Sequence, residues 1–142
     1  MDLSIIIPVF NEEQSINRLF DEIKLAIDNN YSYEIIFIND GSTDNTVNVI
    51  SQIILNNENV KLIDLNKNYG KSIALQEGFN YSSGDIVVTM DGDLQDDPSE
   101  INKLISVINN GSDIVSGWKK DRNDPFSKTF PSKFFNYIVS FF

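Results

Sequence analysis

The stretch LSIIIPVF, residues 3–10, is apolar almost without interruption. A strand with one face in water alternates apolar and polar residues, whereas a strand covered on both faces is apolar along its length. Four further runs of this kind follow: YEIIFIND (33–40), VKLIDL (60–65), DIVVTMD (85–91) and DIVSGW (113–118). The pattern predicts five short strands that are buried on both faces.

The segments between these runs carry apolar residues at helical spacing. In the first of them the spacing is shown by Ile16, Leu19, Phe20, Ile23 and Ile27. The predicted helices cover residues 12–29, 43–56, 71–81 and 99–109. Strands that alternate with helices predict an α/β fold with a mostly parallel sheet flanked by helices. A chain of 142 residues is long enough for a single domain with one core.

Ligands of such sheets bind beyond the carboxyl ends of the strands, where the loops face helix N-termini. In this sequence those ends read PVFNEE, NDGSTD, NKNYGK, DGDLQDD and GWKKDR. The polar and charged residues of the chain therefore gather where the fold places ligand sites. We expect the functional site at this edge of the sheet.

Composition excludes several chemistries. The chain has no cysteine, which excludes disulfides, zinc–thiolate sites and thiol nucleophiles. It has no histidine either, which excludes a Ser-His-Asp triad and imidazole acid–base catalysis. The remaining means of catalysis are carboxylates, Lys, Arg, hydroxyl groups and a bound metal ion.

The formal net charge of −10 is unevenly distributed. The last 25 residues hold five basic and two acidic side chains, a charge of +3, so the first 117 residues carry −13. This argues against general nucleic-acid binding and permits a basic surface near anionic lipid or phosphate. The N-terminus lacks the basic region of a signal peptide, and no run reaches the ~20 apolar residues of a membrane span.

The last segment, PSKFFNYIVSFF (131–142), leaves almost no polar face. It is interpreted as a helix that is covered by the core or by a partner, or as a helix lying in a membrane interface. The aromatic residues that end at Phe142 predict that the chain is an N-terminal fragment whose covering part is missing.

The segment DGDLQDDP (91–98) follows an apolar run, so Asp91, Asp93 and Gln95 could converge on one cation. A site of oxygen ligands suits Mg²⁺ or Mn²⁺. The alternative is an acidic turn in which Asp96 or Ser99 caps the next helix, and for these two residues the cap is favoured. Uncompensated clustered charge at a strand end favours the metal site for the first two carboxylates.

Two other strand ends have both a structural and a functional interpretation. Asp40 in FINDGSTDNT (37–46) could accept a hydrogen bond from a base N–H, or it could form a turn before a helix capped by Ser42, Thr43 or Asp44. The segment PVFNEE (8–13) could end a strand and cap a helix with Asn11.

Four segments in order, IIIPVFNEE, IFINDGSTDNT, NKNYGKSIALQEGF and VVTMDGDLQDDP, resemble the family 2 glycosyltransferases, which have the Rossmann-like GT-A fold. The resemblance covers nearly the whole chain. Within the family, the Gln after Asp-x-Asp, the DDP sequence and SGWKKDRNDPFSKTFPSK resemble the polyisoprenyl-phosphate glycosyltransferases, such as dolichol-phosphate mannose synthases.

The resemblance implies site residues in three groups. The nucleotide-sugar pocket would be formed by Pro8, Phe10, Glu12, Asp40 (bonded to the base), Lys71 and Asp91. The metal, Mg²⁺ or Mn²⁺, would be held by Asp91, Asp93 and Gln95. The acceptor phosphate would be bound by Lys119, Arg122, Lys128 and Ser132, although relatives often have Arg where Lys119 and Lys128 stand. The catalytic residues would be Asp91, Asp93 and Arg122.

The resemblance also implies an organisation and a reaction. Residues 1–118 would form the nucleotide-sugar-binding core, and residues 119–142 a basic acceptor-side loop and the start of an apolar interfacial helix. An inverting, metal-dependent enzyme would move a sugar from a UDP- or GDP-linked donor to a polyprenyl phosphate. It would act at the cytoplasmic face of the membrane, with the fragment itself soluble. The alternatives are a family 2 transferase with a sugar hydroxyl acceptor, and a donor-binding module without turnover; oligomeric state stays open.

Overall fold

A computed structural model describes residues 1–117 of the chain. Its sheet has four parallel strands in the order β3-β2-β1-β4. They are β1 (Leu3–Val9), β2 (Tyr33–Asn39), β3 (Val60–Asp64) and β4 (Ile86–Thr89). The predicted α/β fold with a parallel sheet is confirmed, and four of the five predicted strands are present.

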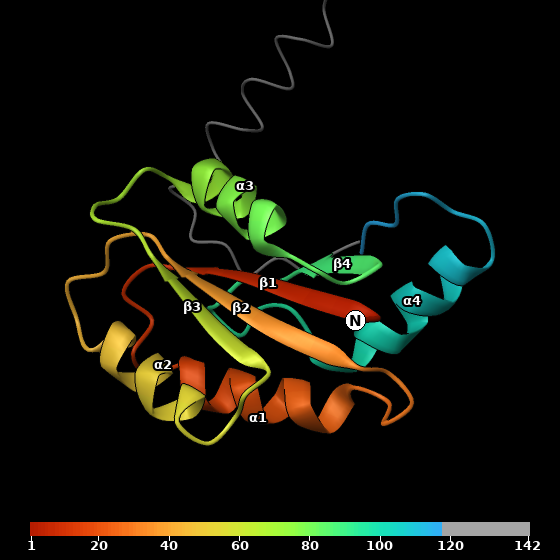
Figure 1. Cartoon of the computed structure of the whole chain (residues 1–142), viewed down its shortest axis with the longest axis horizontal. Helices are drawn as coiled ribbons and strands as arrows, with labels where there is room; N and C mark the ends of the chain where they lie inside the picture. Colours follow the sequence, from red (N-terminus) through yellow and green to blue (C-terminus); the bar gives the residue numbers. More distant parts are fainter. Residues whose placement is uncertain (118–142) are drawn as a thin grey trace, which may run out of the picture.

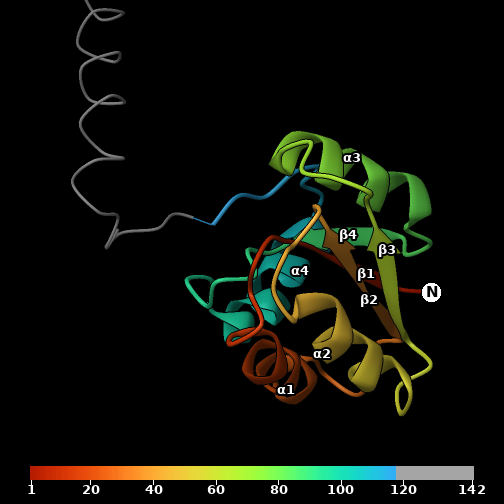
Figure 2. The same ribbon diagram turned by 90° about the vertical axis from the view of Figure 1, so that its left-hand side faces the viewer.

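Helices flank both faces of this sheet, as Figures 1 and 2 show. They are α1 (Ile16–Ala26), α2 (Thr46–Ile54), α3 (Lys71–Tyr81), the 3₁₀ helix η1 (Pro98–Glu100) and α4 (Ile101–Asn109). Helices α1 and α2 lie side by side on one face, and α3 lies alone on the other (Figure 2). The four predicted helices are confirmed, but the first two are shorter than predicted at both ends.

The two central strands explain why the apolar runs are continuous. Along β1, alternate residues from Leu3 to Val9 join the large core under α1, while Ile6 points to the opposite face. There it packs with Ile36, Ile38 and Ala74 beneath α3. A Cβ atom on Gly78 would come within 2.3 Å of Ile6 Cγ2, so this glycine lets α3 approach the sheet closely. Both faces of β1 and β2 are thus buried, as predicted.

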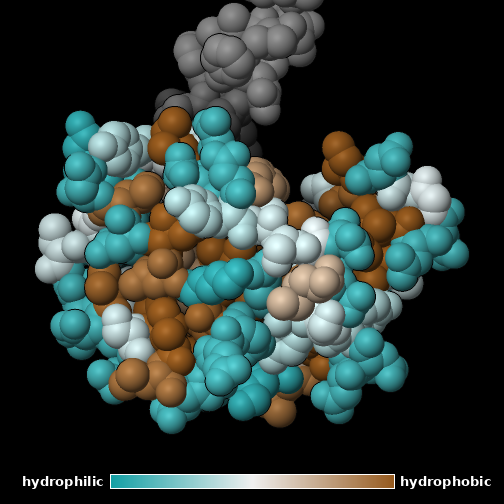
Figure 3. All heavy atoms as spheres, viewed as in Figure 1, coloured by the Kyte–Doolittle hydropathy of each residue, from teal (hydrophilic) through white to brown (hydrophobic). Residues whose placement is uncertain are grey.

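The outer strands β3 and β4 are only partly covered. Val87 of β4 is 37% exposed, and Leu62 and Ile63 of β3 are half-buried. Figure 3 shows apolar surface between α3 and α2, where β3 forms the edge of the sheet. Helix α3 packs mainly on β1 and β2 and leaves one face of the outer strands largely open within the described residues, so the prediction of burial on both faces was wrong for β3 and β4.

The fifth predicted strand, over residues 113–118, is wrong for the part that the structure describes. Residues 113–117 have no strand conformation, and Ile114 is 89% exposed. β-Branched residues form a strand only when a neighbouring strand pairs with them, and none of the four described strands does so. The local pattern was present, but the hydrogen-bonding partner was not.

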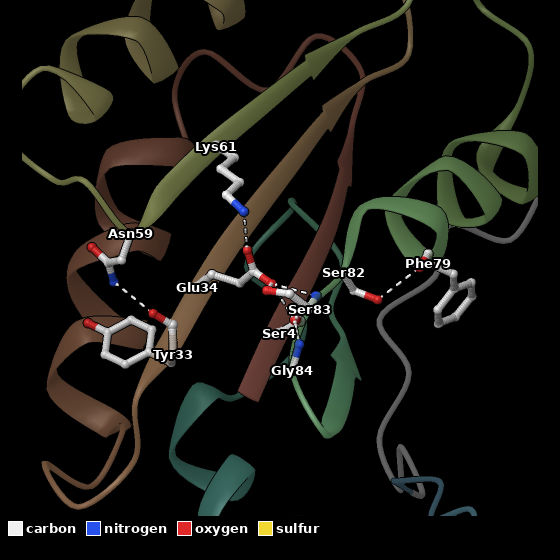
Figure 4. Close-up of polar contacts among 9 residues, drawn as sticks. All are labelled: Ser4, Tyr33, Glu34, Asn59, Lys61, Phe79, Ser82, Ser83 and Gly84. Atoms are coloured by element: carbon white, nitrogen blue, oxygen red, sulfur yellow. Dashed lines mark hydrogen bonds and ion pairs between the residues drawn. The ribbon is translucent and has the colours of Figure 1, made fainter. Parts of the chain in front are cut away.

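A buried carboxylate fastens the amino ends of the strands on the α3 face (Figure 4). The side chain of Glu34 has no solvent exposure and accepts hydrogen bonds from Ser4 Oγ (2.7 Å), Ser83 N (2.8 Å) and Ser83 Oγ (2.6 Å). Its other oxygen pairs with Lys61 Nζ at 2.6 Å. Gly84 N also donates to Ser4 Oγ. This network, the Glu34 cluster, joins β1, β2 and β3 to the segment between α3 and β4.

The Glu34 cluster should make the free energy of unfolding depend on pH. Burial alone would raise the pKa of Glu34, but hydrogen bonds from Lys61, Ser83 and Ser4 outweigh it and lower the pKa from 4.5 to about 2. A shift of that size corresponds to about 3 kcal/mol of stability. Because the folded-state pKa is depressed, this stability is present above pH 4.5 and is lost as the pH falls towards 2.

We therefore expect Glu34→Gln to lower the free energy of unfolding by about 2 kcal/mol at pH 7. The difference from the wild type should shrink as the pH falls from 4.5 towards 2, because the wild-type carboxylate then becomes protonated and loses its contribution to stability, whereas the amide of the variant does not titrate. Urea unfolding at a series of pH values measures it. Glu58→Gln makes the same chemical change at an exposed position and should have a small effect at every pH. A difference for Glu34→Gln that is independent of pH would contradict the assignment.

Candidate functional site

A cleft of about 380 Å³ lies at the carboxyl ends of β1, β2 and β4. After β1 the chain continues into α1 on one face of the sheet, and before β4 it passes through α3 on the other face (Figure 2). The strand order therefore reverses between the neighbouring strands β1 and β4. Ligands of open α/β sheets bind at such a reversal. The cleft is lined by Pro8, Val9, Phe10, Glu12, Asp40, Asn68, Gly70, Lys71, Asp91, Gly92 and Asp93.

The loop after β1 is held by the loop after β2. Asn11, whose φ of 56° is unusual for a residue with a side chain, donates from its N–H to Ser42 Oγ at 2.9 Å. Its side-chain oxygen accepts from Thr43 N at 2.8 Å, so Asn11 ties two loops together and does not cap α1. Glu12 N donates to Thr46 Oγ1 at 2.8 Å. These bonds fix the wall of the cleft that carries Phe10.

Asp40 also lines the cleft and is 4% exposed. Its two carboxylate oxygens accept hydrogen bonds from Tyr69 N (2.7 Å) and Gly70 N (2.9 Å). Next to it, Gly41 has a φ of 70°, and a Cβ atom there would lie 2.4 Å from the backbone of Lys67. Asp40 and Gly41 thus hold the loop before α3 against the end of β2. Asp44, one of the alternatives for a cap, accepts from Thr46 N at the start of α2.

Two of the residues that line the cleft form an ion pair. Lys71, the first residue of α3, donates from Nζ to Asp91 Oδ1. The Lys71 side chain is 59% exposed and the Asp91 side chain 32% exposed, so the pair faces solvent. Asp91 follows β4, and Asp93 lines the cleft beside it. The cleft therefore combines one ammonium group with the carboxylates of Asp91 and Asp93, in addition to those of Glu12 and Asp40.

Gln95 does not join the two aspartates. It lines a separate hollow with Arg18 and Pro98, on the α1 side of the loop. Leu94 has a positive φ of 62°, which turns the chain sharply after Asp93. The three-residue metal set is therefore not assembled, and the cleft holds two of its members. Gln95 N, not its side chain, contacts Asp93 by donating to Oδ1 at 3.1 Å.

The remaining carboxylates of this segment have structural partners. Asp96 accepts from Asp91 N at 2.8 Å and so shapes the turn. Asp97 accepts from Ser99 N at 2.9 Å and caps η1, in which Pro98 is the first residue. These hydrogen bonds from Ser99 lower the pKa of Asp97. The predicted cap exists, but Asp97 provides it in place of Asp96 or Ser99.

Two carboxylates fit a divalent cation only in part. Within residues 1–117, no group of three or more His, Cys, Asp or Glu side chains is arranged to hold a metal ion. Asp91 and Asp93 supply the oxygen ligands that Mg²⁺ and Mn²⁺ prefer, and both ions commonly take further ligands from substrate phosphates. These two carboxylates would therefore suit a cation that takes its remaining ligands from a bound phosphate group.

The cleft unites most of the expected donor-site residues: Pro8, Phe10, Glu12, Asp40, Lys71, Asp91 and Asp93. The acceptor residues Lys119, Arg122, Lys128 and Ser132 lie outside the described residues. Asn68, Gly70 and Gly92 also line the cleft and were not predicted. The polar segment NKNYGK at a strand end was the available signal for the first two. Each described helix is too short or too polar to span a bilayer.

A parallel α/β sheet flanked by helices, with a polar cleft at its strand reversal, places the chain in the class of Rossmann-like α/β proteins. Residues 4–142 match the family model "Glycosyl transferase family 2", and the chain belongs to that family. The GT-A-like fold expected from the sequence is thereby confirmed.

Curated relatives include two transferases named for polyprenyl phosphates. The chain is 36% identical over 140 residues to the undecaprenyl-phosphate 4-deoxy-4-formamido-L-arabinose transferase of Proteus mirabilis, covering 97% of this chain and 43% of the relative. It is 35% identical over 143 residues to the dodecaprenyl-phosphate galacturonate synthase of Rhizobium johnstonii, covering 98% and 42%. The chain thus spans about two fifths of the length of these relatives.

Solved structures share the fold. The 1–349 segment of TarS from S. aureus superposes with a TM-score of 0.71 at 23% identity, covering 88% of this chain and 38% of that one. Glucosyl-3-phosphoglycerate synthase from Mycobacterium tuberculosis, in complex with Mn²⁺, UDP and phosphoglyceric acid, gives a TM-score of 0.63 at 26% identity. That match covers 80% of this chain and 40% of the synthase.

Proposed function

We propose that this chain is the donor-binding part of a glycosyltransferase that moves a sugar from a UDP- or GDP-linked donor to a polyisoprenyl phosphate. One observation carries the proposal: a single cleft at the strand reversal brings together Asp91, Asp93, Lys71 and the loop held by Asp40. Family membership supports the reaction class, and the names of the two curated relatives support the lipid acceptor.

The donor would occupy the cleft with its base between the loops after β1 and β3. Phe10 and Pro8 offer apolar surface on one side, and Asn68 lies across the cleft. Asp40 would reach the base only through lone pairs that the bonds to Tyr69 and Gly70 leave open. The main role of Asp40 would therefore be structural, because it holds the loop that would face the nucleotide.

The diphosphate would lie near Lys71 and the start of α3, where the helix dipole favours negative charge. Asp91 and Asp93 would hold Mg²⁺ or Mn²⁺, which when bound neutralises charge on the leaving diphosphate. A lipid phosphate is already ionised at neutral pH, so the protein needs no strong base to activate it. This agrees with a chain that lacks histidine.

The acceptor side is assigned to residues 119–142, beyond the donor-binding core of residues 1–118. There Lys119, Arg122, Lys128 and Ser132 would bind the acceptor phosphate, and Arg122 would contact the reacting group. Five basic residues against two acidic ones suit a phosphate at the cytoplasmic membrane surface. Attack on the sugar from the face opposite the leaving diphosphate would invert its anomeric configuration.

The proposal is tested by incubating the complete protein with Mn²⁺, a panel of UDP- and GDP-sugars, and polyprenyl phosphate. We expect nucleoside diphosphate to be released only when the lipid phosphate is present, with one donor preferred. Release that requires a free sugar or oligosaccharide would instead indicate a hydroxyl acceptor. If no donor in the panel turns over with either acceptor while UDP or GDP still binds, the protein is a binding module.

A further inference from the structure

Lys71 and Asp91 contact each other in the donor cleft, although 20 positions separate them in the sequence. Lys71 begins α3, and Asp91 follows β4. Asp91 is also one of the two carboxylates that suit a divalent cation. The ammonium group of Lys71 therefore lies against a carboxylate that the cation needs.

We propose that Lys71 pairs with Asp91 before a donor binds, and that Asp91 becomes available to a divalent cation only when a nucleoside diphosphate binds in the cleft. This inference rests on the proposed function. A lysine ammonium and a divalent cation repel each other strongly when both contact one carboxylate, because like charges at such short distances interact strongly near a protein surface. Lys71 thus lowers the affinity of the cleft for the cation alone.

A diphosphate removes this competition by offering Lys71 a better partner. The side chain is largely exposed on a flexible stem, so it can turn from Asp91 to a phosphate oxygen without moving α3. Lys71 stands at the N-terminus of α3, where no side chain caps the helix and where an anion is favoured. The diphosphate also supplies the cation with oxygen ligands that Asp91 and Asp93 lack.

Cation and nucleotide should consequently bind with positive coupling, and that coupling is the same whichever ligand binds first. Besides contacting a phosphate, Lys71 would lower the affinity of the cleft for the metal ion when no nucleotide is bound. The loop held by Asp40 keeps Lys71 in reach of both partners, since Gly70 directly precedes it.

Manganese binding to the 142-residue chain, measured without nucleotide from the EPR signal of free Mn²⁺, tests the inference. We expect Lys71→Met to bind Mn²⁺ about fivefold more tightly than the wild type, since an exposed ion pair is worth up to ~1 kcal/mol. Lys71→Arg keeps the competing charge and should bind like the wild type. Lys103→Met is the matched control, because it removes a lysine from the exposed Lys103–Glu100 pair on the α4 side.

The same proteins are then titrated with UDP and GDP at saturating Mn²⁺. Lys71→Met should bind the preferred nucleotide about tenfold more weakly, while Lys103→Met should bind it normally. If the wild type binds a nucleotide but Lys71→Met binds Mn²⁺ alone no more tightly than the wild type does, the competition is refuted and the donor site stands. If the wild type binds neither nucleotide, the proposed function fails, and the inference fails with it.

Discussion

Asp93→Asn is expected to weaken UDP or GDP binding in the presence of Mn²⁺ at least tenfold, and to slow sugar transfer by the complete protein about 10²–10³-fold. Asp91 and Asp93 are the two cleft carboxylates that we propose as metal ligands, so the loss of one would leave the cation a single protein carboxylate beside the diphosphate. Removal of one group that stabilises transition-state charge typically costs a factor of this size. Calorimetry on the 142-residue chain measures the first effect.

Asp85→Asn provides the control for this variant. Asp85 is exposed and directly precedes β4, whereas Asp93 follows it, so the substitution removes the same charge at the other end of the strand. It should leave nucleotide affinity unchanged. Nucleotide affinity in Mn²⁺ that is equal for Asp93→Asn and wild type would remove Asp93 from the metal site.

Asp40→Ala is expected to lower the free energy of unfolding by about 4 kcal/mol and to abolish measurable nucleotide binding. Two backbone N–H groups, of Tyr69 and Gly70, donate to this carboxylate, and bonds to a charged acceptor are worth about 1.5–3 kcal/mol each. Their loss also frees the loop before α3, which places Asn68 in the cleft and leads into Lys71. Urea unfolding and calorimetry measure the two effects separately.

A matched comparison separates the structural role of Asp40 from a direct role in binding the base. Asp40→Asn keeps one acceptor oxygen but turns an NH₂ group towards a backbone donor, so we expect an intermediate loss of stability. If Asp40 acts mainly by holding the loop, stability and nucleotide affinity should fall in the same order across both variants. Full stability with lost binding would instead assign Asp40 to the base.

Local pattern was sufficient for the elements of the core. The apolar runs at Leu3–Val9 and Tyr33–Asn39 form central strands, and α3 spans the predicted residues 71–81. Periodicity of apolar residues predicts these elements because the side of the chain that must be buried is a local property. The same reasoning was wrong for residues 113–117, because strand formation there depends on a neighbour that the local sequence does not specify.

The α/β class, a candidate site at the carboxyl edge of the sheet and most of the residues that line the cleft could be predicted from the sequence. The contacts between those residues depend on the three-dimensional fold. Residues 20 to 30 positions apart contact one another in two places. Lys71 pairs with Asp91, and the carboxylate of Asp40 accepts hydrogen bonds from Tyr69 N and Gly70 N. Gln95 lies two positions from Asp93 yet in another hollow. Spacing specifies which residues reach an edge, whereas backbone dihedral angles and long-range packing decide which side chains meet.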